Sequence, residues 1–318
     1  MLNDHPRNEF YRAALTKIIT PESIVVEIGT GSGLLSMIAA RLGAKHVTAI
    51  EANDHLAAIA MRNFEANGLA DRITVINKMS TDVREDELPH GRATVLVSEI
   101  LGTLLLGESA LEFTADARKH LLQPDAKIVP ANGSQFVAIV ESADLESITT
   151  VRNWGGFDLV GFNCLKDTAS VVFTKQYGFR FSSVSHNFLT ERVSIADVDF
   201  HVDEFEPADG ALEKRFRVQA LADGTAHAAI FSWEVHSDAT RAVSMTTHPE
   251  DTRDNFARDM QWGQALQLLE DHTAPAVAEG GTPVPLVVSA GEWLDIIVKY
   301  STNGVLIQTL VERAPGPP

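Results

Sequence analysis

The sequence predicts an α/β chain in two parts, a parallel sheet covered by helices and then an antiparallel β region. Three observations support this: apolar strand-like runs alternate with helical patterns up to Pro130, glycines directly follow the first apolar run, and helical signals become sparse after Pro130. The chain has 318 residues, and a chain of this length usually holds about two domains. We therefore expect one domain over residues 1–129 and a second over residues 130–318.

The elements of the first part follow from short apolar runs and from helix start and stop signals. Strands are predicted at 24–28, 46–50, 73–77 and 94–98, and helices at 34–42, 54–67 and 111–122. The second helix begins on the cap residue Asp54 and ends at Gly68, and the third ends near Pro124. Strands that alternate with helices in this way imply a parallel sheet covered on both faces.

The second part is predicted to be mostly antiparallel β, with strands at 135–140, 229–233 and 293–298. Residues 250–260 are polar and predict a short helix or a loop. Residues 143–177 fit neither pattern, which is typical of an insertion between strands. The terminal segment 314–318 is rich in proline and is expected to be disordered.

The composition of the chain limits the classes of function that it can have. The chain has 43 acidic and 26 basic residues, which gives a net charge of −17. Such a field repels nucleic acid and attracts cationic substrates, although acidity also serves solubility. No apolar run is long enough to cross a membrane, the N-terminus has no signal-like apolar region, and Cys164 is the only cysteine. We expect a cytoplasmic protein that binds neither nucleic acid nor membrane.

The glycine-rich segment 27–33, with the sequence EIGTGSG, follows the first predicted strand. Its G-x-G-x-G spacing differs from the G-x-G-x-x-G of dinucleotide enzymes, and no P-loop Lys-Ser/Thr pair follows it. Glu27 can accept a hydrogen bond from an ammonium group, and Glu51, which follows the second strand, can accept both hydroxyls of a ribose. The segment therefore predicts a nucleoside cofactor that carries an amino acid, and a dinucleotide dehydrogenase or a plain tight turn are the alternatives.

Two glutamates bracket the almost wholly apolar linker 100–107. Glu99 follows the fourth predicted strand, where open α/β sheets place their ligands, and Glu108 comes nine residues later. If both side chains meet in one pocket they repel each other, and a guanidinium relieves this repulsion by donating to both. The alternative is that Glu108 only caps the helix that begins near Ser109, and the spacing alone does not separate the two.

These residues resemble the protein arginine methyltransferases, and the resemblance covers most of the chain. It is carried by residues 1–8 (MLNDHPRN), the loop 27–33 with Glu51, the segment 98–108, the crossing 128–130 (IVP) and residues 156–158 (GFD). Within the family, residues 1–4 and 77–81 and the end of the glutamate segment are most similar to the monomethylating branch, protein arginine methyltransferase seven.

The resemblance implies an S-adenosylmethionine-dependent methyltransferase that acts on arginine in a protein or peptide. It implies a Rossmann-like class I methyltransferase domain, then an antiparallel β-barrel substrate domain with a helical dimerisation arm, for which 143–177 is the candidate. It also implies a homodimer. A methyltransferase that acts on a small guanidine or another small molecule, and a weakly active regulatory partner that binds the cofactor, remain as alternatives.

For the cofactor, the resemblance implies contacts from Arg7, Glu27, Gly29, Gly31, Gly33, Glu51, Ser80 and Thr81. Arg7 would bind the cofactor carboxylate and Glu51 the ribose. Ser80 and Thr81 stand where the family contacts adenine. It implies no metal ion.

For the substrate, the resemblance implies that Glu99 and Glu108 are catalytic and clamp the guanidinium. Other residues implied around the pocket are Met1, Asp4, Gln261 and Trp262. The family's Thr-His-Trp loop stands here as residues 260–262 (MQW), so Gln261 would donate to Asp4 without the charge of a histidine. Family members also have a lid helix before the Met-Leu-x-Asp segment. Since this chain begins at Met1, the true start lies upstream or the lid comes from elsewhere.

Overall fold

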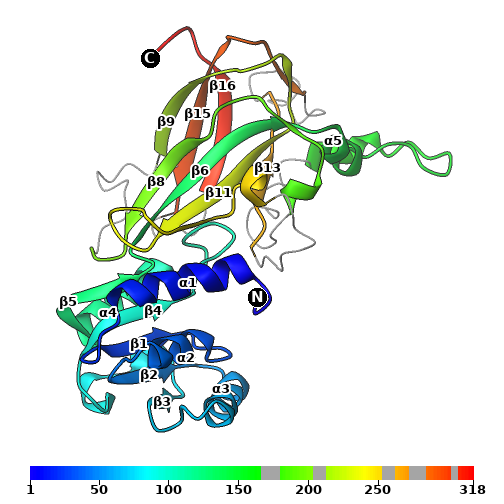
Figure 1. Ribbon diagram of the computed structural model, residues 1–318. Coiled ribbons are helices and arrows are strands. Elements are labelled where there is room, and N and C mark those ends of the chain that lie inside the picture. Colours follow the sequence, from blue (N-terminus) through cyan, green and yellow to red (C-terminus); the bar gives the residue numbers. More distant parts are fainter. Residues whose placement is uncertain (166–179, 203–212, 253–261, 272–283, 302–306) are drawn as a thin grey trace.

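The computed structural model of the protein describes residues 1–165, 180–202, 213–252, 262–271, 284–301 and 307–318. Gln261 and the last part of the candidate arm, 166–177, therefore lie outside the described residues, as does most of the segment 250–260. In Figure 1, the parallel sheet with its helices lies below the antiparallel sheets.

A parallel sheet of five strands forms the first part, in the order β3-β2-β1-β4-β5. Its strands are β1 (Ile24–Ile28), β2 (His46–Ile50), β3 (Ile73–Ile76), β4 (Ala93–Ser98) and β5 (Leu122–Val129). Each neighbouring pair is parallel, which confirms the predicted Rossmann-like sheet. The sequence did not predict β5, because Pro124 was interpreted only as a helix stop. β5 tolerates this proline because it lies at the edge of the sheet, where the pairing with β4 shifts register.

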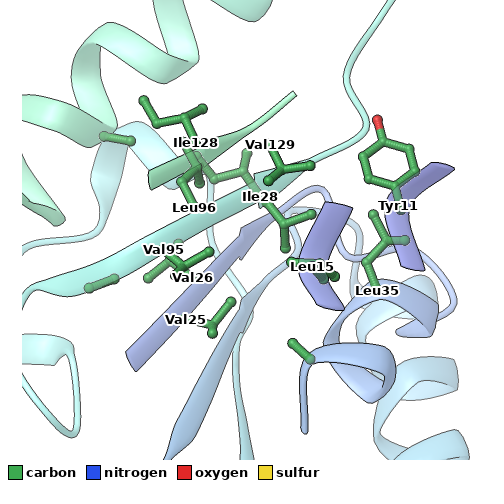
Figure 2. Packing of buried hydrophobic residues seen from close by; sticks show 14 of the residues in the cluster. Tyr11, Leu15, Val25, Val26, Ile28, Leu35, Val95, Leu96, Ile128 and Val129 are labelled. Carbon is green, nitrogen blue, oxygen red and sulfur yellow. The ribbon is translucent and has the colours of Figure 1, made fainter. Parts of the chain in front are cut away.

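Four helices accompany the sheet in the first part of the chain. They are α1 (His5–Ile18), α2 (Leu34–Arg41), α3 (Asp54–Ala66) and α4 (Ala110–His120). The sequence predicted the last three but not α1, whose cap residue Asp4 accepts a hydrogen bond from the Arg7 N–H. Figure 2 shows Leu15 of α1 near Ile28 of β1 and Tyr11 of α1 near Leu35 of α2, so this helix completes the core of the first part.

Antiparallel sheets form the second part, as the sequence predicted. One sheet runs β12-β11-β6-β7, with β8 also paired to β6 and β13 to β11, and smaller sheets run β16-β15-β9 and β10-β14. The strands are β6 (Asn132–Glu141), β7 (Asn187–Phe188), β8 (Val193–Asp199), β9 (Glu213–Gln219), β10 (Gly224–Ala226), β11 (Ala228–His236), β12 (Ser244–Thr246), β13 (Ala265–Leu268), β14 (Leu286–Val288), β15 (Trp293–Tyr300) and β16 (Ile307–Arg313). The predicted strands 135–140, 229–233 and 293–298 lie within β6, β11 and β15.

The described part of the candidate arm begins with the short helix α5 (Ala143–Thr149), and Figure 1 shows the chain after it projecting from the antiparallel sheets. A 3-10 helix follows at Val160–Leu165. The C-terminal segment 314–318, expected to be disordered, is instead held by the Arg217 guanidinium, which donates to the carbonyls of Gly316 and Pro317 at 3.3 Å each.

The linker 100–107 joins two hydrophobic cores. Leu101, Leu105 and Leu106 belong to the core of the parallel sheet, which also takes in Trp233 and Trp262 from the second part of the chain. Leu104 belongs instead to the core of the antiparallel sheets. This linker, which separates the two predicted catalytic glutamates, is therefore packed against both parts of the molecule.

Candidate active site

The glycine segment turns the chain from β1 into α2. Gly29, Gly31 and Gly33 all have positive φ, at 72°, 53° and 85°. At Gly33, an added Cβ would lie 2.3 Å from the Phe64 ring, so this glycine is required for the packing of α3 on α2. At Gly31, an added Cβ would meet nothing within 4 Å. The backbone at Gly31 thus borders open space that a ligand can fill.

Glu27 is buried directly beneath this turn. Its Oε2 accepts hydrogen bonds from the Thr30 hydroxyl at 2.6 Å, from the Ser36 N–H at 2.9 Å and from the Ser36 hydroxyl. Burial raises the pKa of Glu27 to about 7, although these hydrogen bonds favour the ionised form. The carboxylate therefore ties β1 to the first turn of α2.

Glu51 follows β2 and faces the glycine segment. Its Oε2 accepts from the Gly31 N–H at 2.8 Å, and its Oε1 accepts from the Asn53 N–H at 2.9 Å. Two backbone donors thus fix the carboxylate at the carboxyl ends of β1 and β2. Ser80 and Thr81, the other predicted nucleoside contacts, begin a short 3-10 helix (Ser80–Asp82) after β3, at the same edge of the sheet.

The two glutamates are brought together by a tight hairpin after β4. An added Cβ at Gly102 would lie 2.7 Å from the Gly107 Cα, so the two arms of the hairpin touch at these glycines. The Gly107 N–H donates to the Leu104 carbonyl at 2.8 Å and closes the turn. The N-cap of α4 is Ser109, so Glu108 is not the cap residue of that helix.

Burial perturbs both carboxyl groups, and the charge of Glu108 also acts on Glu99. Burial raises the pKa of Glu99 to about 7, the charge of Glu108 adds to the rise, and the nearby Arg7 guanidinium opposes it. Burial also raises the pKa of Glu108. The charge of Glu108 thus acts on Glu99, so the two carboxyl groups lie near each other, and their role as a guanidinium clamp stays a prediction.

Helix α1 supplies a guanidinium to this site. Arg7 Nη2 donates to Glu99 Oε2 at 2.9 Å, with the two side chains only 8% and 6% exposed. One turn later, the Tyr11 hydroxyl donates to the Ser98 carbonyl at 3.0 Å. The sequence predicted a different contact for Arg7, with the cofactor carboxylate, and did not predict Tyr11, although the spacing i, i+4 places both on one face of a helix.

Two tryptophans and a glutamine from the second part of the chain hold the hairpin backbone. Trp262 Nε1 donates to the Leu101 carbonyl at 2.7 Å, and Trp233 Nε1 donates to the Gly102 carbonyl at 3.0 Å. Gln135 Oε1 accepts from the Leu105 N–H at 2.8 Å. Trp262 was predicted to line the pocket, whereas Trp233 and Gln135 were not predicted as functional residues.

The remaining predicted residues lie near the start of α1 or beyond the described ranges. Asp4 is completely buried and caps α1, and the exposed Met1 lies in the turn before it. Gln261, the proposed partner of Asp4, is outside the described residues. Within the described ranges, no group of three or more His, Cys, Asp or Glu could hold a metal ion. Nor is any helix described here long and apolar enough to cross a membrane.

Comparisons with known proteins all find methyltransferases. The profile described as "Ribosomal protein L11 methyltransferase (PrmA)" matches residues 4–129. The arginine N(omega)-methyltransferase of Streptomyces achromogenes subsp. streptozoticus is 34% identical over 301 residues, 95% of this chain and 75% of that protein. The protein arginine N-methyltransferase 7 of Drosophila ananassae is 32% identical over 265 residues, 78% of this chain and 37% of that protein. The chain thus spans three quarters of the first relative and well under half of the second.

Solved structures show the same fold. A chain of the Trypanosoma brucei PRMT1 enzyme–prozyme heterotetrameric complex with AdoHcy has a TM-score of 0.74 at 23% identity, covering 98% of this chain and 96% of that one. Arabidopsis thaliana protein arginine methyltransferase 10 has a TM-score of 0.71 at 18% identity, covering 100% of this chain and 93% of that one. At these identities the likeness is one of fold.

Proposed function

Because the chain belongs to the arginine N-methyltransferase family, we propose that it transfers a methyl group from S-adenosylmethionine to a guanidino nitrogen of arginine, held by Glu99 and Glu108. One observation carries the assignment of the clamp: a guanidinium, that of Arg7, already binds Glu99 at 2.9 Å inside the buried site. The charge of the Glu108 carboxylate acts on Glu99, so we propose that this second carboxylate accepts from the same planar cation.

The residues at the carboxyl edge of the parallel sheet fit the cofactor. The fixed Glu51 carboxylate suits the ribose hydroxyls, and the open space at Gly31 admits a ligand next to it. All three donors to Glu27 bind Oε2, so an ammonium group would bind at Oε1. Ser80 and Thr81 are proposed to contact the adenine. S-adenosylmethionine, when bound, supplies the methyl group from a positively charged sulfonium.

Arg7 has two proposed partners. It binds Glu99 through Nη2, and its Nη1 donates to the Asn8 side chain at 2.9 Å. Its Nε is buried and has no hydrogen-bond partner among the described residues. A cofactor carboxylate would satisfy this donor, and burial with an orphaned N–H otherwise costs about 1–3 kcal/mol. We therefore propose that Arg7 joins the cofactor site to the substrate site.

The glutamates act by holding charge. A guanidinium has a pKa above about 12 and is a poor nucleophile because its lone pairs are delocalised. Glu99 and Glu108 keep the positive charge on two of its nitrogens, which leaves more electron density on the third. The carboxylates also align that nitrogen with the methyl carbon. The nitrogen releases its proton after it has bonded to carbon, so the site needs no strong base.

The division of the chain supports this arrangement. We propose that residues 1–129 bind the cofactor and that residues 130–318 form a β-barrel substrate domain. The match of the family profile ends at residue 129, the last residue of β5, and antiparallel pairing begins with β6. A cytoplasmic location is proposed as well, because the chain has a single cysteine.

The exposed apolar side chains of the candidate arm support a homodimer. Ile148, Trp154, Phe157 and Phe162 are 70%, 76%, 66% and 63% exposed. Such a cluster of large apolar side chains marks a protein interface. Helix α3 of the first domain also carries exposed apolar side chains, at Leu56, Ile59 and Met61. We propose that the arm of one subunit packs on the first domain of its partner.

The substrate itself has two candidate classes. We propose arginine within a protein or peptide as the first, in line with the name of the Drosophila relative. The Streptomyces relative, which matches 95% of this chain, is named for arginine alone, and this favours a free guanidino compound as the second. Mass spectrometry of the products from a peptide panel and from a metabolite panel separates the two.

The decisive test of the reaction is transfer of a radiolabelled methyl group from S-adenosylmethionine to a cell lysate, followed by analysis of the modified amino acid. Methylarginine in the hydrolysate is the expected product. Label on a different amino acid contradicts the assignment. Cofactor binding without any transfer supports the alternative of a regulatory partner, against which the two intact glutamates Glu99 and Glu108 argue.

A further inference from the structure

We propose that Trp233 and Gln135 are positioning residues that fix the hairpin between Glu99 and Glu108 in its active geometry. The proposal rests on the assignment of these two glutamates as the guanidinium clamp. It concerns two side chains of the antiparallel region that are buried and polar, and whose hydrogen bonds are directed at the backbone of the linker 100–107.

Trp233 is held rigidly on β11. Its backbone N–H donates to the Thr247 hydroxyl at 2.9 Å, and its carbonyl accepts from the Thr247 N–H at 2.9 Å. Its ring is completely buried and meets the Trp262 ring edge-to-face, with centroids 4.9 Å apart. The indole N–H therefore has one fixed direction, toward the Gly102 carbonyl.

Gln135 is the direct cross-strand neighbour of Trp233, on β6. Its Nε2 donates to the Ser232 carbonyl at 2.8 Å, which orients the amide so that Oε1 accepts from the Leu105 N–H. The pair thus presents one donor and one acceptor side by side. The linker offers the complementary groups three residues apart, the Gly102 carbonyl as acceptor and the Leu105 N–H as donor.

The two anchor points are placed symmetrically between the glutamates. Gly102 comes three residues after Glu99, and Leu105 comes three residues before Glu108. Because the hairpin is closed tightly at Gly102 and Gly107, a shift of either anchor moves the backbone that carries a carboxylate. A displacement of 1 Å in such a site can reduce a rate by about 100-fold.

The test uses two variants, each of which removes one of these two hydrogen-bonding groups. Trp233→Phe removes the indole N–H, and Gln135→Met removes the amide acceptor. Trp293→Phe is the matched control, because Trp293 lies on β15 in a different sheet. The measured quantities are kcat and KM with an arginine substrate, and the number of binding sites for S-adenosylhomocysteine per chain. Dividing kcat by this number removes any unfolded fraction.

Both variants are expected to lose about 10- to 100-fold in kcat per binding site. Their affinity for S-adenosylhomocysteine, and the kcat per binding site of the control variant, should change less than about twofold. An unchanged kcat per binding site overturns the proposal, as does a loss matched by an equal loss of binding sites. A second readout does not depend on turnover. The Leu105 amide should exchange its hydrogen faster in both variants, and equal exchange rates contradict the proposal even if the wild type methylates no arginine.

Discussion

At the scale of single residues, the ion pair between Arg7 and Glu99 dominates the site. Both side chains are almost fully buried, and a buried pair costs several kcal/mol when one partner is removed, because the other charge is left without compensation. An ion pair of this kind is therefore weak evidence for stabilisation of the fold and stronger evidence for a role in binding. The energetic cost of this ion pair is consistent with a pocket that binds the Arg7 guanidinium and also receives the guanidinium of a substrate.

Glu99→Gln is expected to reduce methyl transfer to arginine by at least about 100-fold, because the neutral amide cannot hold the positive charge of the guanidinium. Steady-state kinetics measure the loss, and calorimetric titration with S-adenosylhomocysteine should show that cofactor binding persists. Glu112→Gln, on an exposed position of α4, is the matched control. Equal turnover of the two variants would remove Glu99 from the proposed mechanism.

The pH dependence of the reaction should report the same carboxyl group. Because burial raises the pKa of Glu99 to about 7, a large fraction is protonated below neutrality. We expect kcat/KM at saturating cofactor to rise with pH and to level off above the pKa of Glu99. The affinity for the cofactor, measured over the same range, separates Glu99 from Glu27, whose pKa is also about 7. A profile that is flat between about pH 6 and 8 contradicts the assignment.

The same shift predicts the opposite trend for stability. The pKa of Glu99 in the folded protein lies above the ordinary value of 4.5 for a glutamate. Between these values the folded protein binds more protons than the unfolded chain, so the contribution of Glu99 to the free energy of unfolding falls as pH rises. Activity and this part of the stability therefore change in opposite directions with pH.

At the scale of elements, the end of β2 combines structural and binding roles. Asn53, and not the predicted Asp54, caps α3, with its side-chain oxygen accepting from the N–H groups of His55 at 3.0 Å and Leu56 at 3.1 Å. Its own N–H donates to Glu51. One short segment thus begins a helix and orients the carboxylate proposed to bind ribose.

Asn53→Ala is expected to lower the free energy of unfolding by about 1 kcal/mol, because two N–H groups in the first turn of α3 lose their acceptor. Urea unfolding followed by circular dichroism measures the change. Asn53→Asp keeps the acceptor and should retain most of the stability. If the alanine variant is as stable as the aspartate variant, the cap does not contribute as described.

The elements also show what the sequence could predict. Strands such as β1 and β4 are buried along almost their whole length, so a continuous apolar run identified them. Helix α1 has a mixed pattern in which only the buried stripe around Tyr11 and Leu15 is apolar, and it was missed despite the cap at Asp4. The two glutamates stood out in the sequence because they bracket an almost wholly apolar linker of eight residues, and their role as a pair stays a prediction.

The anchors of the hairpin could not be predicted in this way. Gln135 and Ser232, which meet across β6 and β11, are 97 residues apart in the sequence. Only the pairing of those strands brings Gln135 and Trp233 to the linker. A buried glutamine in a strand pattern carries no local sign of its partner, so the contact depends on tertiary structure alone.

At the scale of the whole molecule, the distribution of apolar surface argues for association. The candidate arm carries large exposed apolar side chains, and Figure 1 shows the segment after α5 projecting from the antiparallel sheets. The net charge of −17 opposes nonspecific association. A contact that persists against this repulsion must therefore bury apolar surface.

The wild type is expected to have the mass of a dimer in light scattering at micromolar concentration. Replacing Trp154 and Phe162 together with arginine should shift the mass to that of the monomer, because charged groups at these positions cannot be buried without partners. Leu221→Arg, at another exposed apolar position, should leave the mass unchanged. A monomeric wild type contradicts the proposed homodimer.

The linker 100–107, which has side chains in both hydrophobic cores, limits how this protein can be recombined with its relatives. A chimaera that joins the first part of one chain to the second part of another would place Leu104 of one protein in the antiparallel core of the other. It would also place the linker backbone of one protein opposite Trp233 of the other. A junction placed only at the end of β5 would therefore separate the hairpin from the strands that hold it. The hairpin must be transplanted together with the strands β6 and β11 that hold it.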